Sequence, residues 1–135
     1  MAKIISGGET SRFMLALKNV GAGAALPPTM IFDEIDTGIS GKVGQAVACK
    51  MARIAKSRQV ICVTHMPQIA AMADRSFLIS KSEQSGKTLT AVRPLDPAEF
   101  VAEISRLTGG GGISAHAEHQ ARDMIEWAGK VKMES

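Results

Sequence analysis

The spacing of apolar residues predicts a strand, a helix and a second strand in the first half of the chain. Residues 30–32 and 60–64 are continuous apolar runs, which is typical of short buried strands. Between them, from Gly41 to about Lys56, apolar residues recur at helical spacing. This order predicts a βαβ unit in which the strands are parallel, the sheet is covered on both faces and the crossover is right-handed.

The flanking segments predict further helices and a hairpin. A glycine-rich turn at Ser6–Glu9 opens a helix that ends before Pro28, and Pro67 begins another that runs to about Ala73. Residues 76–81 and 88–93 predict an antiparallel hairpin around a loop at 82–87. Two helices follow: one capped by Asp96 and running through Leu107, the other extending from Ile113 to Ala128 after the linker Gly109–Gly112. The predicted fold class is therefore α/β, with a mainly parallel sheet flanked by helices and a hairpin and helices towards the C-terminus.

Length and composition limit the class of protein. The 135 residues suffice for one domain, and 45% of them are hydrophobic, so the chain can bury a core. Four Phe, one Trp and no Tyr argue against an aromatic platform for stacked bases, and a net charge of +3 permits a polyanionic partner without requiring one. Cys49 and Cys62 lie in apolar stretches, so we expect buried thiols in a reducing compartment. With neither a membrane span nor a signal peptide in the sequence, we expect a soluble cytoplasmic protein.

Carboxylates follow the first predicted strand, and a histidine follows the second. Asp33, Glu34 and His65 should meet at the carboxyl edge of the sheet, where open α/β folds bind ligands. One carboxylate could hold Mg²⁺, and the next could accept a proton from water, especially if burial raised its pKa. The alternatives are an acidic turn that caps the following helix and a histidine that only packs.

Other polar patterns have simpler interpretations. Ser6–Glu9 offers backbone N–H groups at a helix start, which suits an anion, although Gly-Gly is also an ordinary turn. Gly86-Lys87-Thr88 matches the last three positions of the phosphate-loop pattern. That pattern also requires a glycine at the position of Lys81, so we interpret the segment as a hairpin turn. A solvated helix face is the simpler interpretation of His116, His119 and Asp123, which could otherwise share a metal.

Taken together, these motifs resemble those of ABC-type ATPases. Ser6–Glu9 resembles the signature motif, Met30–Glu34 the Walker B strand, Ile35–Gly38 the D-loop and Thr64-His65 the switch histidine. The amino-acid sequences of three longer stretches resemble more closely still the RecN family of bacterial DNA repair proteins. These proteins are relatives of the structural maintenance of chromosomes (SMC) proteins. These stretches are residues 5–18, 31–41 and 62–74.

The resemblance implies roles for single residues. Asp33 would organise Mg²⁺, Glu34 would be the general base for water, and His65 would touch the γ-phosphate of ATP. The signature residues would grip a nucleotide held mainly by a second head of a homodimer, and Asp36 would lie at the same interface. The signature residues are Ser6, Gly7, Gly8 and Glu9. The resemblance also implies DNA as a partner of the full-length protein, association with the nucleoid and no membrane.

The sequence contains no phosphate loop, which in this family precedes the signature motif. We therefore expect residues 1–135 to be the C-terminal lobe of an ATPase head, either an excised domain or an incomplete reading frame, whose own N-terminal lobe is its partner. Alone, it should bind ATP poorly and hydrolyse none, although the full-length protein would be an ATP hydrolase. Two alternatives stay open: a non-catalytic self-association or interaction module, and a head fragment of another ABC-type ATPase such as a transporter subunit.

Overall fold

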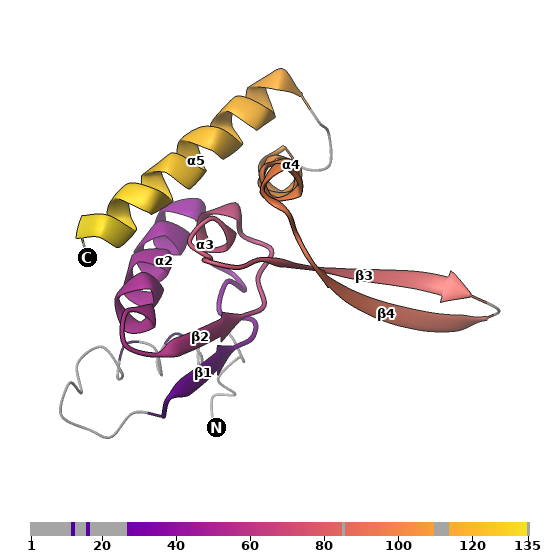
Figure 1. Cartoon of the computed structure of the whole chain (residues 1–135), viewed down its shortest axis with the longest axis horizontal. Coiled ribbons are helices and arrows are strands. Elements are labelled where there is room, and N and C mark those ends of the chain that lie inside the picture. Colours follow the sequence, from indigo (N-terminus) through magenta and orange to yellow (C-terminus); the bar gives the residue numbers. More distant parts are fainter. Residues whose placement is uncertain (1–11, 13–15, 17–26, 85, 110–113, 135) are drawn as a thin grey trace, which may run out of the picture.

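The computed structural model describes residues 12, 16, 27–84, 86–109 and 114–134. Figure 1 shows a short parallel sheet at one side, helices stacked above it, and a long hairpin that extends away from both. In chain order the elements are β1 (Thr29–Phe32), α2 (Gly41–Ala55), β2 (Gln59–Cys62), α3 (Pro67–Ala70), β3 (Phe77–Gln84), β4 (Lys87–Pro94), α4 (Pro97–Thr108) and α5 (Ala115–Glu134). The α/β class predicted from the sequence is confirmed.

The βαβ unit forms as predicted. β1 pairs with β2 in parallel, Thr29 opposite Gln59 and Phe32 opposite Cys62, and α2 connects the two strands. Met30 and Phe32 point into the core and are 2% and 3% exposed, respectively. The expectation of a sheet covered on both faces is wrong for the described residues, because Ile31, between these two core residues, is 71% exposed. Successive side chains of a strand point to opposite faces, and the described helices cover only one of them.

The helices form the core with that covered face. Buried residues of α2 pack beneath α5, and α3 and α4 close the side (Figure 1). α4 begins with a capping box, in which the Asp96 carboxylate accepts from the Glu99 amide while the Glu99 carboxylate accepts from the Asp96 amide. α5 buries the small residues Ala117, Ala121 and Ala128, as its predicted amphipathic face requires.

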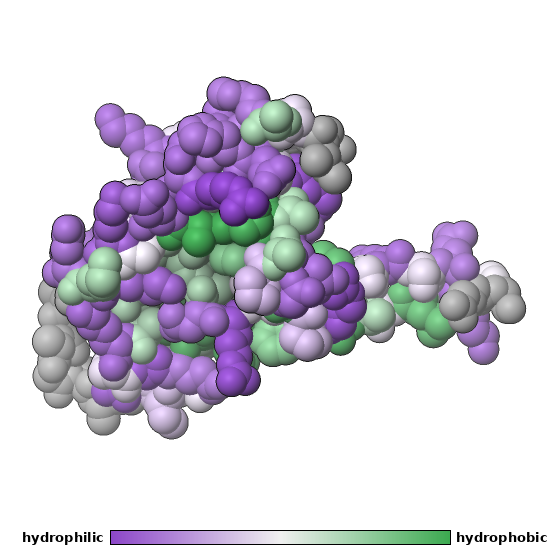
Figure 2. All heavy atoms as spheres, turned by 45° about the horizontal axis from the view of Figure 1, so that its top comes forward, coloured by the Kyte–Doolittle hydropathy of each residue, from purple (hydrophilic) through white to green (hydrophobic). Residues whose placement is uncertain are grey.

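The hairpin is longer than predicted. β3 and β4 pair as far as Gln84 opposite Lys87, so most of the loop expected at residues 82–87 is strand. Gly86 has a φ of 74°, a left-handed conformation that suits a tight hairpin turn. Ser82 and Glu83 are exposed, which explains why their polar sequence resembled a loop. In Figure 2 hydrophobic side chains on the hairpin lie open between hydrophilic ones; the exposed apolar residues of the hairpin are Phe77, Ile79, Leu89 and Val92.

Two other expectations need correction. α3 ends at Ala70 rather than about Ala73, because the Met72 and Ala73 amides donate to carbonyls only three residues back and tighten the chain into turns. Cys49 and Cys62 are free thiols, as expected, but each is only partly buried.

Candidate functional site

A sharp turn follows β1 and places two carboxylates at the surface. Ile35 is fully buried, whereas Asp33 and Glu34 just before it are exposed. Glu34 has a φ of 55°, a left-handed conformation that is uncommon for a residue with a side chain. The Thr37 amide donates to the Glu34 carbonyl at 3.1 Å and closes the turn. Burial of Ile35 therefore anchors the segment that carries the two acids.

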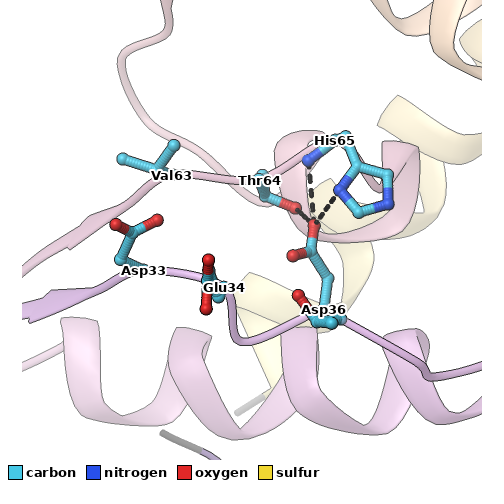
Figure 3. Close-up of a pocket in the computed structure, with 7 residues that line it drawn as sticks. Asp33, Glu34, Asp36, Val63, Thr64 and His65 are labelled. Carbon is cyan, nitrogen blue, oxygen red and sulfur yellow. Dashed lines mark hydrogen bonds and ion pairs between the residues drawn. The ribbon is translucent and has the colours of Figure 1, made fainter. Parts of the chain in front are cut away.

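The segment after β2 faces this turn. The Val63 amide donates to the Phe32 carbonyl at 2.9 Å, so the pairing of the strands continues to the edge of the site. Thr64 and His65 come next, and together the two segments enclose an open pocket of about 220 Å³ (Figure 3). Its lining consists of Asp33, Glu34, Asp36, Thr37, Val63, Thr64 and His65.

Asp36 joins the two segments. Its side chain is 3% exposed, and one oxygen, Oδ2, accepts from the Thr64 hydroxyl, from the His65 amide at 2.8 Å and from the Met66 amide at 3.3 Å. The same oxygen lies 3.1 Å from Nδ1 of His65 (Figure 3). Burial acts to raise the pKa of Asp36, but the hydrogen bonds from Thr64 and His65 outweigh it, and the pKa is lowered. Asp36 is therefore a buried carboxylate anion that ties the histidine segment to the acidic turn.

The pKa of the Cys62 thiol is affected by the same carboxylates. Burial, followed by the negative charges of Asp36 and Asp33, raises the pKa of its thiol to about 12. A thiol with this pKa stays protonated at neutral pH, so Cys62 is unsuited to act as a nucleophile. The charges of the two carboxylates thus act on Cys62 in the same direction as burial, which is the larger cause.

Sequence reasoning missed Arg12. Its guanidinium donates from Nη1 to the Ile35 carbonyl at 3.1 Å and to the Thr37 carbonyl at 2.8 Å. These two bonds hold the backbone of the acidic turn from outside the βαβ unit. The available signal was its place three residues after Glu9, in the segment next to the glycine-rich turn.

The structure brings four of the predicted site residues to one pocket. Asp33, Glu34 and His65 line one pocket at the carboxyl ends of parallel strands, which confirms their predicted positions; their chemical roles stay predictions. Glu34 is exposed, so the burial considered for it is not observed. The carboxylate of Asp36 is turned inward, where three donors of the histidine segment surround it; its expected place at an interface with a second head stays a prediction. Ser6, Gly7, Gly8 and Glu9 lie outside the described residues.

The other polar patterns have ordinary surroundings. Lys87 and Thr88 belong to β4, and His116 is 3.0 Å from Gln120 rather than bound to Asp123. His119 lies 3.5 Å from Asp123 on the exposed face of α5. Across the described residues, no group of three or more His, Cys, Asp or Glu side chains is arranged to hold a metal ion. None of the described helices combines the length and the apolar character needed to cross a bilayer.

Both the sequence and the fold of the chain are similar to those of known proteins. No family model matches the chain. The chain is 42% identical over 132 residues to the DNA repair protein RecN of Bacillus subtilis and 43% identical over 128 residues to that of Streptomyces coelicolor, covering 98% and 95% of this chain, respectively. It spans only 23% and 22% of these two relatives.

A solved structure agrees in fold. It comes from work on the ATP-driven dimerization and DNA-stimulated activation of SMC ATPases, and it superimposes with a TM-score of 0.55 at 24% identity, covering 76% of this chain and 61% of the other. The fold of the chain is therefore similar to part of this SMC ATPase structure. The sequence of the chain is similar to the C-terminal part of RecN proteins, which confirms the resemblance seen in its motifs.

Proposed function

We propose that residues 1–135 form the C-terminal lobe of the ATPase head of a RecN-like DNA repair protein. The observation that carries this proposal is the meeting of Asp33, Glu34 and His65 in one open pocket at the ends of two parallel strands. Open α/β sheets bind ligands at this edge. Similarity to RecN proteins supports DNA repair as the context, and cytoplasmic, nucleoid-associated action follows from that context.

The donor set fits Mg²⁺ held jointly with a nucleotide. Asp33 offers carboxylate oxygens beside the pocket, the ligand type that Mg²⁺ prefers. The described residues hold no ready cage of three or more ligands, and Mg²⁺ in phosphoryl-transfer sites usually takes one or two carboxylates and completes its shell with phosphate oxygens and water. When bound, Mg²⁺ would neutralise charge that develops on the phosphates. Asp33 is the residue we propose to hold it.

Glu34 and His65 would act on the terminal phosphate. The carboxylate of Glu34 lies in the pocket next to Asp33, where it can orient a water molecule and accept its proton. The imidazole of His65 is 76% exposed on the opposite wall, where it can contact a phosphate oxygen. Hydrolysis in this scheme depends mainly on positioning and electrostatics, as is general for phosphoryl transfer.

Other segments would complete the site. A phosphate loop is not among these 135 residues, so we propose that an N-terminal lobe supplies the groups that hold ATP, and that this chain alone is inactive. Ser6–Glu9 would contact the nucleotide of a second head, and DNA would be a partner of the complete protein. Dimerization and DNA stimulation, named for the SMC ATPase neighbour, agree with this arrangement.

A chimera tests the proposal. The matching 132-residue segment of the Bacillus subtilis relative is replaced by this chain, and ATP hydrolysis and ATP binding are measured separately. Glu34→Gln should lower turnover at least about 100-fold while binding survives, because it removes the general base but keeps the shape of the side chain. Glu83→Gln, on the exposed hairpin, is the matched control and should leave both unchanged. An inactive parent chimera, or turnover that Glu34→Gln leaves unchanged, would contradict the proposal.

Self-association is a second candidate function. It is favoured by the exposed apolar side chains Ile31, Ile61 and Val63 at the sheet and by those of the hairpin. Contiguous exposed apolar patches mark interaction sites in many proteins. Sedimentation velocity of this chain should then show dimers that persist without nucleotide and that Val92→Thr weakens; a monomer at all concentrations would exclude this candidate.

A further inference from the structure

Two His–Asp pairs among the described residues differ in what the carboxylate contacts. On α5, Asp123 contacts His119 across 3.5 Å with both side chains largely exposed. At the pocket, Asp36 is buried and a single oxygen collects four contacts from Thr64, His65 and Met66. Only the second arrangement fixes a backbone segment as well as a ring.

The ring of His65 is held at one end. Nδ1 lies 3.1 Å from Oδ2 of Asp36, and an ionised carboxylate can only accept, so the proton of this contact is on Nδ1. The opposite nitrogen, Nε2, points away from Asp36 (Figure 3). Since the side chain is 76% exposed, this contact is the main restraint on a ring that is otherwise surrounded by solvent.

The backbone at His65 is fixed by the same oxygen. The His65 and Met66 amides both donate to it, and the Thr64 hydroxyl that donates to it also accepts from the Met66 amide at 3.0 Å. Met66 is the residue that precedes α3, so the helix begins directly from this anchored segment. Asp36 thus sets both the position of the His65 backbone and the direction of its ring.

We infer that Asp36 is a positioning residue that holds the Thr64–Met66 segment and the Nδ1 side of the His65 ring, leaving Nε2 open to contact the terminal phosphate. The phosphate in this inference rests on the proposed function, whereas the geometry of the Asp36–His65 pair is independent of that function.

The tautomer of His65 tests the positioning directly. Nitrogen-15 NMR of the histidine rings is recorded for this chain at about pH 9, where an ordinary imidazole is neutral. The inference predicts that His65 carries its proton on Nδ1, and that Asp36→Asn abolishes this preference and shifts the amide signals of His65 and Met66. Asp123→Asn is the matched control, because it changes the same chemistry at an exposed pair and should leave His65 unaffected.

Two results would overturn the inference: a proton on Nε2 of His65 in the parent chain, or a His65 signal indifferent to Asp36→Asn. The first is decided without any variant, so it holds even if Asp36→Asn fails to fold.

Turnover of the chimera connects the positioning to function. Asp36→Asn should lower kcat by about 10- to 10,000-fold, the range seen when a residue that orients a functional histidine is changed, while Asp36→Glu recovers part of the loss. Unchanged kcat in Asp36→Asn would exclude a positioning role in turnover. If His65 carries its proton on Nδ1 but Glu34→Gln leaves turnover unchanged, the positioning by Asp36 stands and the ATPase function is rejected. The failure of the inference and the failure of the proposed function are therefore distinguishable.

Discussion

The pocket and the exposed face of α5 each contain a histidine beside an aspartate, and the two pairs are not equivalent. The Asp36 side chain is 3% exposed and shares one oxygen among four contacts, whereas Asp123 is 63% exposed and pairs with His119 alone. Exposed pairs contribute little to stability because water and salt screen them. A buried anion surrounded by donors is different, since removing it leaves those donors without a partner. Burial, more than the identity of the two residues, decides which pair organises structure.

The largest expected effect is on stability. Asp36→Ala should lower the free energy of unfolding by about 3–5 kcal/mol, because it removes a buried anion and leaves the Thr64 hydroxyl and the His65 amide without their acceptor. Asp123→Ala should change it by less than about 0.5 kcal/mol. Urea denaturation of both variants measures the difference. Equal effects would show that the buried pair has no special structural weight.

Thiol chemistry should detect the same negative environment. A pKa of about 12 for Cys62, against 9.0 for an ordinary thiol, predicts alkylation at pH 8 about 1,000-fold slower than that of an unperturbed thiol. The rate is followed by mass spectrometry in a Cys49→Ser background. Asp36→Asn should accelerate it, because it removes one of the charges that raise the pKa. A Cys62 that reacts as fast as a free thiol would contradict the described burial and charge.

Acid should destabilise the chain through the buried Asp36 more than through the exposed pair on α5. The folded-state pKa of Asp36 is lower than its usual value of 3.8, so its charge contributes stability above about pH 4. This contribution is lost as the pH falls through the folded-state pKa. Thermal unfolding at a series of pH values should show a loss below about pH 4 that Asp36→Asn reduces and Asp123→Asn retains. A parent chain with no such loss would disagree with the lowered pKa.

Substituting one glycine near the pocket and one on α5 should also affect stability differently, by smaller amounts. A Cβ on Gly44 would lie 2.7 Å from Cε of Met66, next to the anchored histidine segment, whereas one on Gly129 in α5 would meet nothing within 4 Å. Gly129→Ala should therefore stabilise by about 0.5–1 kcal/mol through helix propensity. Gly44→Ala should gain less or destabilise, since Met66 must shift. Calorimetry compares the two; an equal gain would mean that Met66 moves at no cost.

Much of the fold follows from local sequence signals. The apolar runs before Asp33 and before His65 predict two buried parallel strands, and the direction shared by those strands places both residues at one edge. Asp96 predicts a capped helix, and its side chain accepts from the Glu99 amide in the first turn. These features depend on neighbours within a few residues, which periodicity and capping rules describe well.

The features that sequence did not predict depend on distant partners. The inward turn of Asp36 needs donors about 30 residues away, and the sequence shows only an acidic residue near a turn. Arg12 likewise reaches carbonyls more than 20 residues away. The exposed face of the sheet at Ile31 was missed because apolar runs show that a strand can be covered but not which elements cover it.

A double-mutant cycle in the chimera tests most directly whether Glu34 and His65 act on one bound phosphate. Turnover is measured for the parent, for Glu34→Gln, for His65→Ala and for both changes together. If both residues serve the same step, the double variant should be no slower than the slower single variant, because groups that act as a unit are not additive. Losses that multiply, or a single variant with the turnover of the parent, would contradict a shared role at this pocket.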